Sequence, residues 1–583
     1  MSTPVVAPNV VADVLDALPP RLRKRVDTAL DKVAGWEVRV DGDTATAVLD
    51  ADTTLTWTLR GGVLTAAADL VCTCLLAPKC LHRGVAVAAA EVADTASDAP
   101  ADPVASDGPA VAAEPVVSEV DGGFGEPERH AAGGLWSAAA GVLRVGATGS
   151  GVVVRAELLR AVHTARVVGL HRAAATGLRI AASLAAARSG DSSFDREVLT
   201  AELTELLLLC HDIRAGHGDP GELRGTARRE YHPVGALRLY GLCTEAVVTT
   251  SGYAGVVTHL VDDSGMLWSV PAIMPGGRER VPVAAAGPVA IGESGLTQRE
   301  LGRRGLLLSG GTASADRRLG AGRNVRAVAA SGAAWTEPPL AALWAESLPD
   351  QLNRAFDTAA APASHRSAGG ELLFLDATVL GLADGALRVA TDHGPVDLVG
   401  EGERARDNLR VLDAPGLALR FVARPLPDRP GTATALAVAG DDLTLPSELS
   451  GRADLTLDRL QRAYLAVRTD PPTTPLPPRP TPDRVPAPVR PLENVLHRTT
   501  LGGRAVVAVG AVDPAVAYLT ALGLTTTATL LSTLTATSRN RERDAFGRVL
   551  HDEGDDFPTA WLRAAVHLRA VVDATARRAW LPG

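Results

Sequence analysis

The chain has 583 residues, a net charge of −9, only five cysteines and an apolar fraction of 46%. This length exceeds what one hydrophobic core supports, so we expect several domains. The first residues lack a charged and apolar leader, and no run of roughly eighteen apolar residues follows, so neither secretion nor a membrane span is expected. Sparse cysteine favours a reducing cytoplasm, where clustered cysteines bind metal more often than they form disulfides.

The negative charge is concentrated in one segment. Residues 91–130 contain ten acidic residues and a single arginine, which accounts for the whole net charge. The remainder of the chain is electrically balanced. The folded parts therefore have no global field of either sign that would attract a polyanion.

The first ninety residues have the pattern of a small α/β module. Residues 9–34 show the periodicity of two short helices. The alternating segments WEVRV, TATAVLD and TTLTWTLR then predict three strands, separated by DGD, DAD and RGG turns. A cysteine-rich segment follows at once, and CLHRGVAVAAAEV is predicted to close the module as a helix.

The rest of the chain alternates between periodic and irregular composition. In both β regions the predicted order is three strands, a short helix and two strands, which resembles an OB-fold. Ten prolines within residues 471–491 predict a stiff extended spacer. The predicted segments are an N-terminal module at 1–92, an acidic disordered linker at 93–131, a helical region at 132–217, an antiparallel β region at 230–335, a second and looser one at 366–450, the spacer at 471–491, and a helical C-terminal module at 492–583.

The cysteine-rich segment, CTCLLAPKCLH, contains three of the five cysteines. Its candidate metal ligands are Cys72, Cys74, Cys80 and His82, spaced C-x-C-x5-C-x-H. Thiolates and imidazole suit zinc, and four protein ligands make a closed, structural site. Buried cysteines beside a chance histidine are disfavoured because cysteine is so scarce elsewhere. A redox pair is disfavoured because neither C-x-x-C nor a thioredoxin-like βαβ unit is present.

This pattern resembles the SWIM zinc finger, whose ligands follow C-x-C, a variable spacer and C-x-H. The resemblance covers about residues 36–92, and the five-residue spacer is at the short end of the family. It implies zinc as the cofactor and DNA or protein as the binding partner. Bacterial SWIM proteins tend to accompany MoxR-type ATPases and von Willebrand A domain proteins, so the resemblance makes these the expected partners. The expected fold is an α+β multi-domain chain with a zinc-stabilised N-terminal module.

No familiar catalytic motif occurs in the sequence. It has no G-x-x-x-x-G-K-[ST], no H-E-x-x-H and no G-x-S-x-G. We therefore expect a non-enzymatic adaptor. The alternative is an enzyme with an unrecognised active site in the helical or β regions, for which HDIRAGHGDPG, with His211, Asp212, His217 and Asp219, is the best starting point. At a helix end near glycines, however, such residues more often cap or are solvated.

A further expectation is that nucleic acid binds with weak affinity. The candidate phosphate contacts are Arg21, Arg23, Lys24, Arg25, Lys79 and Arg83. Arg238, Tyr240, Tyr253 and Trp268 could stack on bases as residues of OB-folds do. A solvated helix face and core aromatics are the more ordinary interpretations of these residues. Any binding is expected to be salt-sensitive, and tighter once residues 93–131 no longer compete for the arginines.

Overall fold

The computed structural model describes residues 3–50, 52–93, 123–226, 230–249, 252–320, 325–362, 365–427, 429–466, 483–539 and 554–580. The chain divides into two compact units. The first is formed by the described residues of Met1–Ser97, Ala112–Ala227 and Ala487–Ala570, and the second by those of Arg228–Pro486 and Val571–Gly583.

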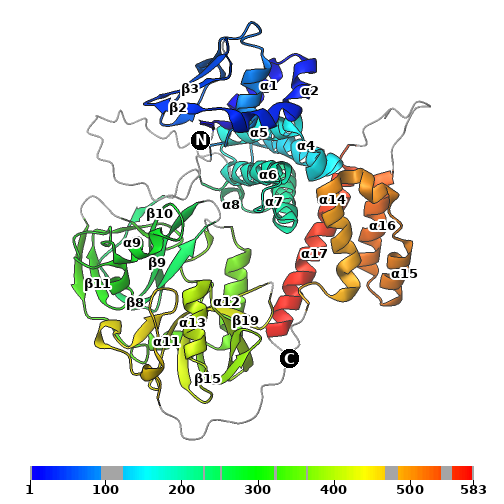
Figure 1. Cartoon of the computed structure of the whole chain (residues 1–583). Helices are drawn as coiled ribbons and strands as arrows, with labels where there is room; N and C mark the ends of the chain where they lie inside the picture. The colour runs from blue at the N-terminus through cyan, green and yellow to red at the C-terminus, as the bar shows by residue number, and fades with distance from the viewer. Residues whose placement is uncertain are drawn as a thin grey trace. The chain divides into compact units, whose positions relative to one another are not determined.

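The N-terminal module belongs to the first unit (Figure 1). Its elements are β1 (Val5–Val6), α1 (Pro8–Ala17), α2 (Pro20–Ala29), a 3-10 helix (Leu30–Gly35), β2 (Val38–Asp41), β3 (Thr44–Val48), β4 (Thr54–Thr58), β5 (Val63–Leu64), a second 3-10 helix (Ala67–Asp69), β6 (Leu70–Cys72) and α3 (Leu81–Ala88). Strands β2, β3, β4 and β6 form an antiparallel sheet in that order. Period-2 alternation buries Ala45, Leu55 and Trp57 on one face. The predicted helices and three strands are confirmed, and β6 is an additional edge strand.

Helices make up the rest of the first unit. They are α4 (Glu126–Gly149), α5 (Val152–Val167), α6 (His171–Ser189), α7 (Arg196–Ala215), α8 (Pro220–Arg224), a 3-10 helix (Ala487–Val489), α14 (Arg490–Val509), α15 (Asp513–Ala521), α16 (Thr525–Arg539) and α17 (Asp556–Trp580), which continues into the second unit from Val571. Helix α14 packs along α4 and α7. A hydrogen bond joins the hydroxyls of Thr200 and Thr500 at 3.0 Å. The predicted C-terminal helical module is therefore not a separate body, because its first helices share a core with the central ones.

One helix begins inside the segment predicted to be an acidic linker. Helix α4 begins at Glu126, within the segment predicted to be disordered up to residue 131. The Gly125 amide donates to the Glu128 carboxylate at 2.7 Å, and Pro127 occupies the first turn. Proline and acidic residues are favoured at a helix N-terminus, so the features interpreted as linker are start signals of a helix. Residues 94–122 of the predicted linker and 467–482, which include much of the predicted spacer, lie outside the described residues.

Helices α4–α6 and α14–α16 of the first unit have the same arrangement. Two residues after the end of α5 and of α15 stands a glycine with positive φ, Gly169 at 88° and Gly523 at 77°. The leucine after each glycine donates its amide to a carbonyl five residues earlier, at 2.9 Å in both cases. This is the Schellman arrangement that stops a helix and turns the chain back. The order α4-α5-α6 thus recurs as α14-α15-α16.

The repeat extends to a shared kink. The long helices α4 and α14 are each interrupted at a glycine with φ of 74°, Gly146 and Gly503. The two glycines meet, because a Cβ built on Gly146 would lie 2.3 Å from the backbone nitrogen of Gly503. The hydroxyl of Thr148 also donates to the carbonyl of Leu501 at 2.9 Å. Only glycine allows the two backbones to approach this closely.

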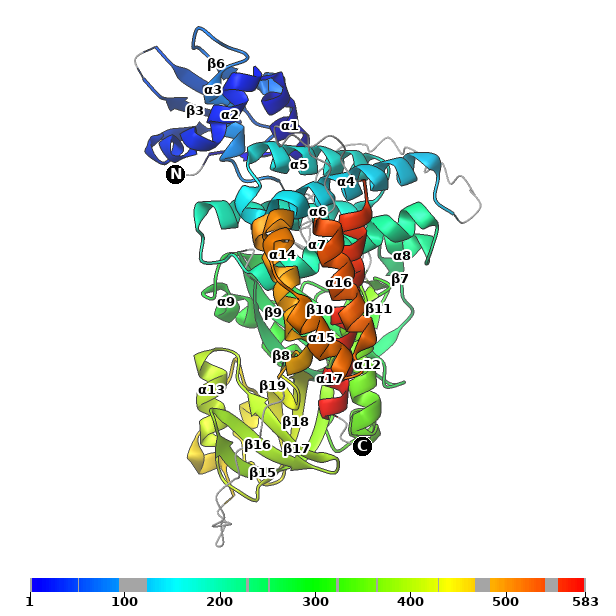
Figure 2. The same cartoon turned by 90° about the vertical axis from the view of Figure 1, so that its right-hand side faces the viewer.

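The second unit contains the two β regions (Figures 1 and 2). The elements of the first are β7 (His232–Pro233), β8 (Leu237–Val248), β9 (Tyr253–Asp262), β10 (Leu267–Pro275), α9 (Arg280–Ala286), α10 (Gln298–Leu301), β11 (Gly305–Ser309), β12 (Thr312–Ala313), β13 (Leu319–Gly320) and β14 (Arg326–Ala330). Helices α11 (Ala341–Ala345) and α12 (Leu348–Ala360) follow. The elements of the second are β15 (Leu373–Ala383), β16 (Ala386–Thr391), β17 (Gly394–Val399), α13 (Gly402–Val411), β18 (Ala418–Pro425), β19 (Thr432–Ala439), 3-10 helices at Ser447–Leu449 and Arg462–Tyr464, and β20 (Arg452–Asp454).

Both β regions follow the same strand order. The first has the order β10-β9-β8-β11-β14, and the second β17-β16-β15-β18-β19 with β20 at its edge. In the second, β17 also pairs in parallel with β19, which closes a five-stranded barrel. Helix α13 lies beside β16 and β17 (Figure 2). The predicted three strands, helix and two strands are present in both regions, although the first region also has the helix α9 and the short strands β7, β12 and β13. The copy interpreted as looser is the one that closes.

The two β regions share a hydrophobic core. A single apolar cluster joins Leu242 and Trp335 to Phe374 and Val422. The Arg424 guanidinium of β18 donates to Glu245 of β8 at 2.7 Å. Burial alone would raise the pKa of Glu245, but Arg424 and His259 outweigh burial and lower it to about 2. The regions therefore form one folded unit, and not two independent modules.

Candidate metal centre

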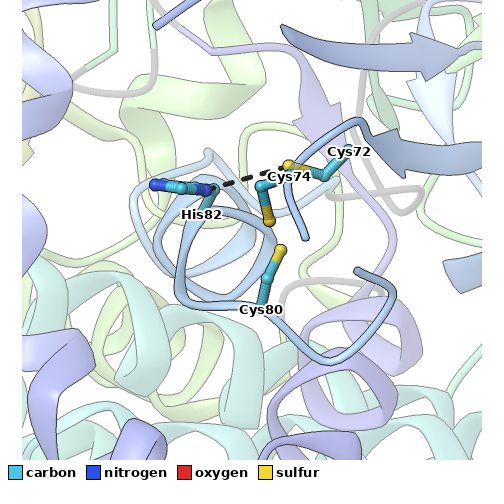
Figure 3. A group of neighbouring side chains, drawn as sticks. All are labelled: Cys72, Cys74, Cys80 and His82. Carbon is cyan, nitrogen blue, oxygen red and sulfur yellow. Dashed lines mark hydrogen bonds between the residues drawn. The ribbon is translucent and has the colours of Figure 1, made fainter. Parts of the chain in front are cut away.

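The end of a strand and the start of a helix bring the predicted ligands together (Figure 3). Cys72 is the last residue of β6, Cys74 lies in the turn after it, and Cys80 and His82 flank the first residue of α3. The ligand atoms of all four residues lie within 4.8 Å of one another. The Cys72 sulfur is 3.8 Å from Nδ1 of His82. The prediction from the spacing C-x-C-x5-C-x-H, that these four side chains lie together, is confirmed.

Local hydrogen bonds direct the chain into this arrangement. Cys72 pairs with Leu55 of β4, so the strand register places its thiol at the sheet edge. The next residue, Thr73, accepts the Thr54 amide at 2.8 Å and donates to the Asp52 carbonyl at 2.9 Å. The Ala77 amide then donates to the Cys74 carbonyl at 3.0 Å, which folds the return loop toward α3.

The surroundings of the three thiols shift their pKa values in different directions. Burial raises the pKa of Cys72 to about 12 and raises that of Cys80. Burial also acts on Cys74, but the Leu76 amide, the two neighbouring thiols and the Ala77 amide lower its pKa on balance. Thiols in such a group cannot all ionise without a compensating charge, whereas a bound dication displaces their protons. Amides directed at ligand sulfurs are the outer shell expected of a metal centre.

The donor set determines what the centre can do. Three thiolates and one imidazole could hold a metal ion such as zinc in a tetrahedral shell. All four positions would then be filled by protein atoms. A closed shell of this kind stabilises a fold and offers no position for a substrate or a reactive water.

Arg83 supports the centre and is not a free phosphate contact. Its side chain is buried, and its guanidinium donates to the carbonyls of Pro78 and Ala67. It thereby ties the return loop and the segment before β6 to helix α3. Burial and these two internal hydrogen bonds disfavour the predicted contact of Arg83 with nucleic acid, which stays a prediction.

Replacing Arg83 by methionine is expected to weaken metal affinity by about 10–100-fold, the usual cost of losing an outer-shell partner. Methionine fills similar space but cannot hold the two carbonyls. Competition against a chromogenic chelator would measure the change in the full chain. The exposed Arg25 provides the matched control as Arg25→Met. Equal affinities for the two variants would contradict a supporting role for Arg83.

The other predicted phosphate contacts are placed differently. Arg23 donates to the Asp16 carbonyl at 2.7 Å and lies 3.5 Å from its carboxylate. The side chains of Arg21, Lys24, Arg25 and Lys79 are exposed. The basic set available to a polyanion is therefore smaller than the sequence suggests.

The candidate base-stacking residues of the first β region are largely engaged. The Arg238 guanidinium lies 4.8 Å from the Tyr240 ring centroid, and its Nε donates to the Tyr240 hydroxyl at 2.7 Å. Trp268 is buried and donates to Asp262 at 2.9 Å. Tyr253 is half-buried at the start of β9. Trp268 is thus a core residue, as the more ordinary interpretation holds.

Two exposed leucines beside the centre were not singled out from the sequence. Leu75 is 103% exposed and Leu76 61% exposed, in the loop between Cys74 and Cys80. The motif itself indicated their exposure. Only five residues separate the second ligand from the third, so the two leucines among them have little room to turn inward. Among the HDIRAGHGDPG residues, the structure gathers His211, Asp212 and His217, whereas Asp219 caps α8 by accepting the Glu222 amide at 2.8 Å.

No family model matches the chain, and neither a curated protein nor a solved structure matches it significantly. Within the described ranges, no single helix is long and apolar enough to cross a membrane. One bent pair, Ala487–Val509 with Asp513–Ala521 at 96°, meets that criterion when its two helices are combined.

Proposed function

We propose that the chain is a non-enzymatic, zinc-dependent binding protein whose N-terminal module is a SWIM-type zinc finger. The observation that carries the proposal is the convergence of Cys72, Cys74, Cys80 and His82 on one point. Their spacing is the SWIM pattern, and three thiolates with one imidazole favour zinc over harder metals. The closed shell argues for a structural ion, so the function of the module is recognition and not catalysis.

The metal-bound loop is the surface best suited to a partner. Zinc fixes Cys74 and Cys80, so Leu75 and Leu76 are presented from an anchored turn. Val71, in the strand β6 that leads into the centre, is a further exposed apolar residue, at 54%. Burying exposed apolar side chains in a partner is favourable, and a loop whose backbone is already fixed loses less entropy on binding.

A protein is the better supported partner. The leucines offer apolar contact, while burial of Arg83 and pairing of Arg23 with Asp16 reduce the basic surface of the module. Nucleic-acid binding needs several phosphate contacts to persist at physiological salt. By family resemblance, a MoxR-type ATPase or a von Willebrand A domain protein is the first partner to test.

The second unit would then present further binding surface on OB-like β regions. Support comes from the order of strands in the barrel, from the parallel pairing of its third and fifth strands, and from the helix between its third and fourth strands. These are features of OB-folds, which serve in many proteins as binding modules without catalytic chemistry. The first β region has the same strand order, which supports a tandem pair.

The proposal is tested by binding purified candidate partners to the full chain. We expect Leu75→Ser with Leu76→Ser to weaken binding of a MoxR-type ATPase or von Willebrand A domain protein from the same organism at least about tenfold, since hot-spot side chains carry about 2 kcal/mol or more. Val167→Ser changes an exposed apolar residue of α5, 72% exposed, and should have no effect. Cys72→Ser should abolish binding together with zinc.

Other outcomes would contradict the proposal. Failure of every tested protein to bind, together with tight binding of single- or double-stranded nucleic acid at low salt, would make the module a nucleic-acid reader. Binding that is equal in the leucine double variant and the wild type would exclude the loop as the contact surface.

A further inference from the structure

We propose that His211, Asp212 and His217 form a second metal site, at the carboxyl end of α7, that binds a divalent transition metal exchangeably. The ligand atoms of the three residues lie within 4.8 Å of one another, although the residues spread over seven positions of the chain. The site shares no residue with the cysteine centre and does not depend on the proposed zinc finger.

The helix end creates the cluster. Helix α7 stops at Ala215, and Gly216 adopts the left-handed conformation at φ 73°. The chain reverses there, so that the His217 amide donates to the Asp212 carbonyl at 2.9 Å. The reversal brings the ring of His217 to 6.3 Å from that of His211, centroid to centroid. A continued helix would have carried His217 away from His211, and this reversal is the structural reason for their proximity.

The donor set indicates the class of metal. Two imidazoles and one carboxylate suit Zn²⁺, Co²⁺, Ni²⁺ or Fe²⁺, and they suit Mg²⁺ and Ca²⁺ poorly because those ions prefer oxygen ligands. Ligand atoms about 2.1 Å from a metal lie roughly 3.4 Å apart in a tetrahedron. Both histidines are exposed and can rotate to close the remaining distance without disturbing the core. Three protein ligands leave at least one position for water.

Asp212 supplies the carboxylate of the cluster and is half-buried, whereas both histidines are exposed. Besides the two histidines, Arg172 is a cation that acts on this carboxylate. Arg172 is itself engaged, since it donates to Glu205 at 3.1 Å. A metal ion bound by the three side chains would therefore be the direct counter-charge of the Asp212 carboxylate.

The site is open to solvent, unlike the cysteine centre. A cleft of about 560 Å³ lies at the same end of α7 and is lined by Arg129, Trp136, Arg214 and Asp555. The Arg129 guanidinium comes within 3.9 Å of the Cβ position of Gly216, next to His217. The Arg214 guanidinium rests 5.3 Å from the Trp136 ring centroid. An ion bound beside this cleft would exchange readily, so binding must be measured at equilibrium.

Cobalt provides the direct test. We expect the full chain, first loaded with about one zinc at the cysteine centre, to retain about one further Co²⁺ in equilibrium dialysis. The retained ion should lack the thiolate-to-cobalt charge-transfer absorption that cysteine ligands produce. His217→Ala and Asp212→Asn should each weaken binding at least about tenfold, because even outer-shell losses cost about that much. His163→Ala, an exposed histidine of α5 outside the cluster, should bind like the wild type.

The result is independent of the zinc finger. Cys72→Ser should still retain the cobalt ion, so loss of the proposed zinc centre cannot be mistaken for loss of this one. His211 and His217 are exposed, and far-ultraviolet circular dichroism should report an unchanged fold in their variants. The proposal is overturned if the zinc-loaded wild type retains no cobalt, if the retained cobalt has thiolate absorption, or if His217→Ala binds it as tightly as His163→Ala.

Discussion

Replacing Cys80 by serine is expected to abolish metal at the Cys72–His82 centre and to unfold residues 3–93 while the helical core persists. A hydroxyl is a poor ligand for a soft dication, so the shell would lose a thiolate anchored at the start of α3. Structural zinc contributes about 10–16 kcal/mol in apparent binding free energy. A small module seldom supplies more than about 3–5 kcal/mol from its own core. The binding free energy of the metal is therefore larger than the folding free energy that the core of the module supplies by itself.

Metal analysis of the purified chain and hydrogen exchange resolved by residue would measure this effect. We expect the metal content to fall by about one ion per chain, the ion of the cysteine centre, and protection of residues 3–93 to disappear. Chelation of the wild type should have the same effect on this protection. Cys210→Ala is the control, because Cys210 is buried in α7 outside the cluster and should leave the metal in place. A Cys80→Ser chain that has lost the ion of the cysteine centre but is fully protected would show that the module folds without this metal.

The second large effect is expected at the crossing of α4 and α14. A Cβ on Gly146 would lie 2.3 Å from the Gly503 nitrogen and 2.5 Å from the Leu501 carbonyl oxygen. With ψ of 168°, Gly146 also occupies a region that only glycine adopts readily, at a cost of about 1–3 kcal/mol for other residues. Adding the forced separation of two backbones, we expect Gly146→Ala to destabilise the first unit by at least about 3 kcal/mol.

Gly141 provides a control in the same helix. No atom lies within 4 Å of its Cβ position, so Gly141→Ala should be neutral or stabilise α4 by up to about 1 kcal/mol. Hydrogen exchange within α4 and α14 is the suitable measurement, because a chain with two units need not unfold in one step. Gly503→Ala should behave like Gly146→Ala, and the double variant should cost less than the sum. Equal protection in the Gly146 and Gly141 variants would contradict the close crossing.

The metal cluster was predictable because its determinants are local. Cys72 and His82 are ten residues apart, so the spacing of ligands alone limits their distance. The order of strands in both β regions was predictable for a similar reason, since alternation and turn residues specify each hairpin. The role of Arg83 was not predictable, because a basic residue beside a metal site resembles a phosphate contact until the carbonyls of Pro78 and Ala67 are placed around it.

What could not be predicted depends on contacts between distant segments. The joining of α4 to α14 is an example, because no local pattern links Thr148 to a carbonyl 353 residues away. The barrel closure between β17 and β19 and the seam between Glu245 and Arg424 are of the same kind. The His211 cluster lies between these cases. Its residues are close in sequence, but their proximity depends on the left-handed turn at Gly216.

The first unit is made of segments that are far apart in the chain, and this affects how the protein folds during synthesis. Ribosomes add about 5–20 residues per second, so the 353 residues between Thr148 and its partner Leu501 take roughly 20–70 s to appear. During that interval α4 and α7 exist without the helix that covers them, while the whole β unit except its last helical segment has already emerged. The nascent chain thus carries uncovered apolar surface for tens of seconds. Holding chaperones and slow translation should both affect its yield more than they affect a protein whose core closes in order along the chain.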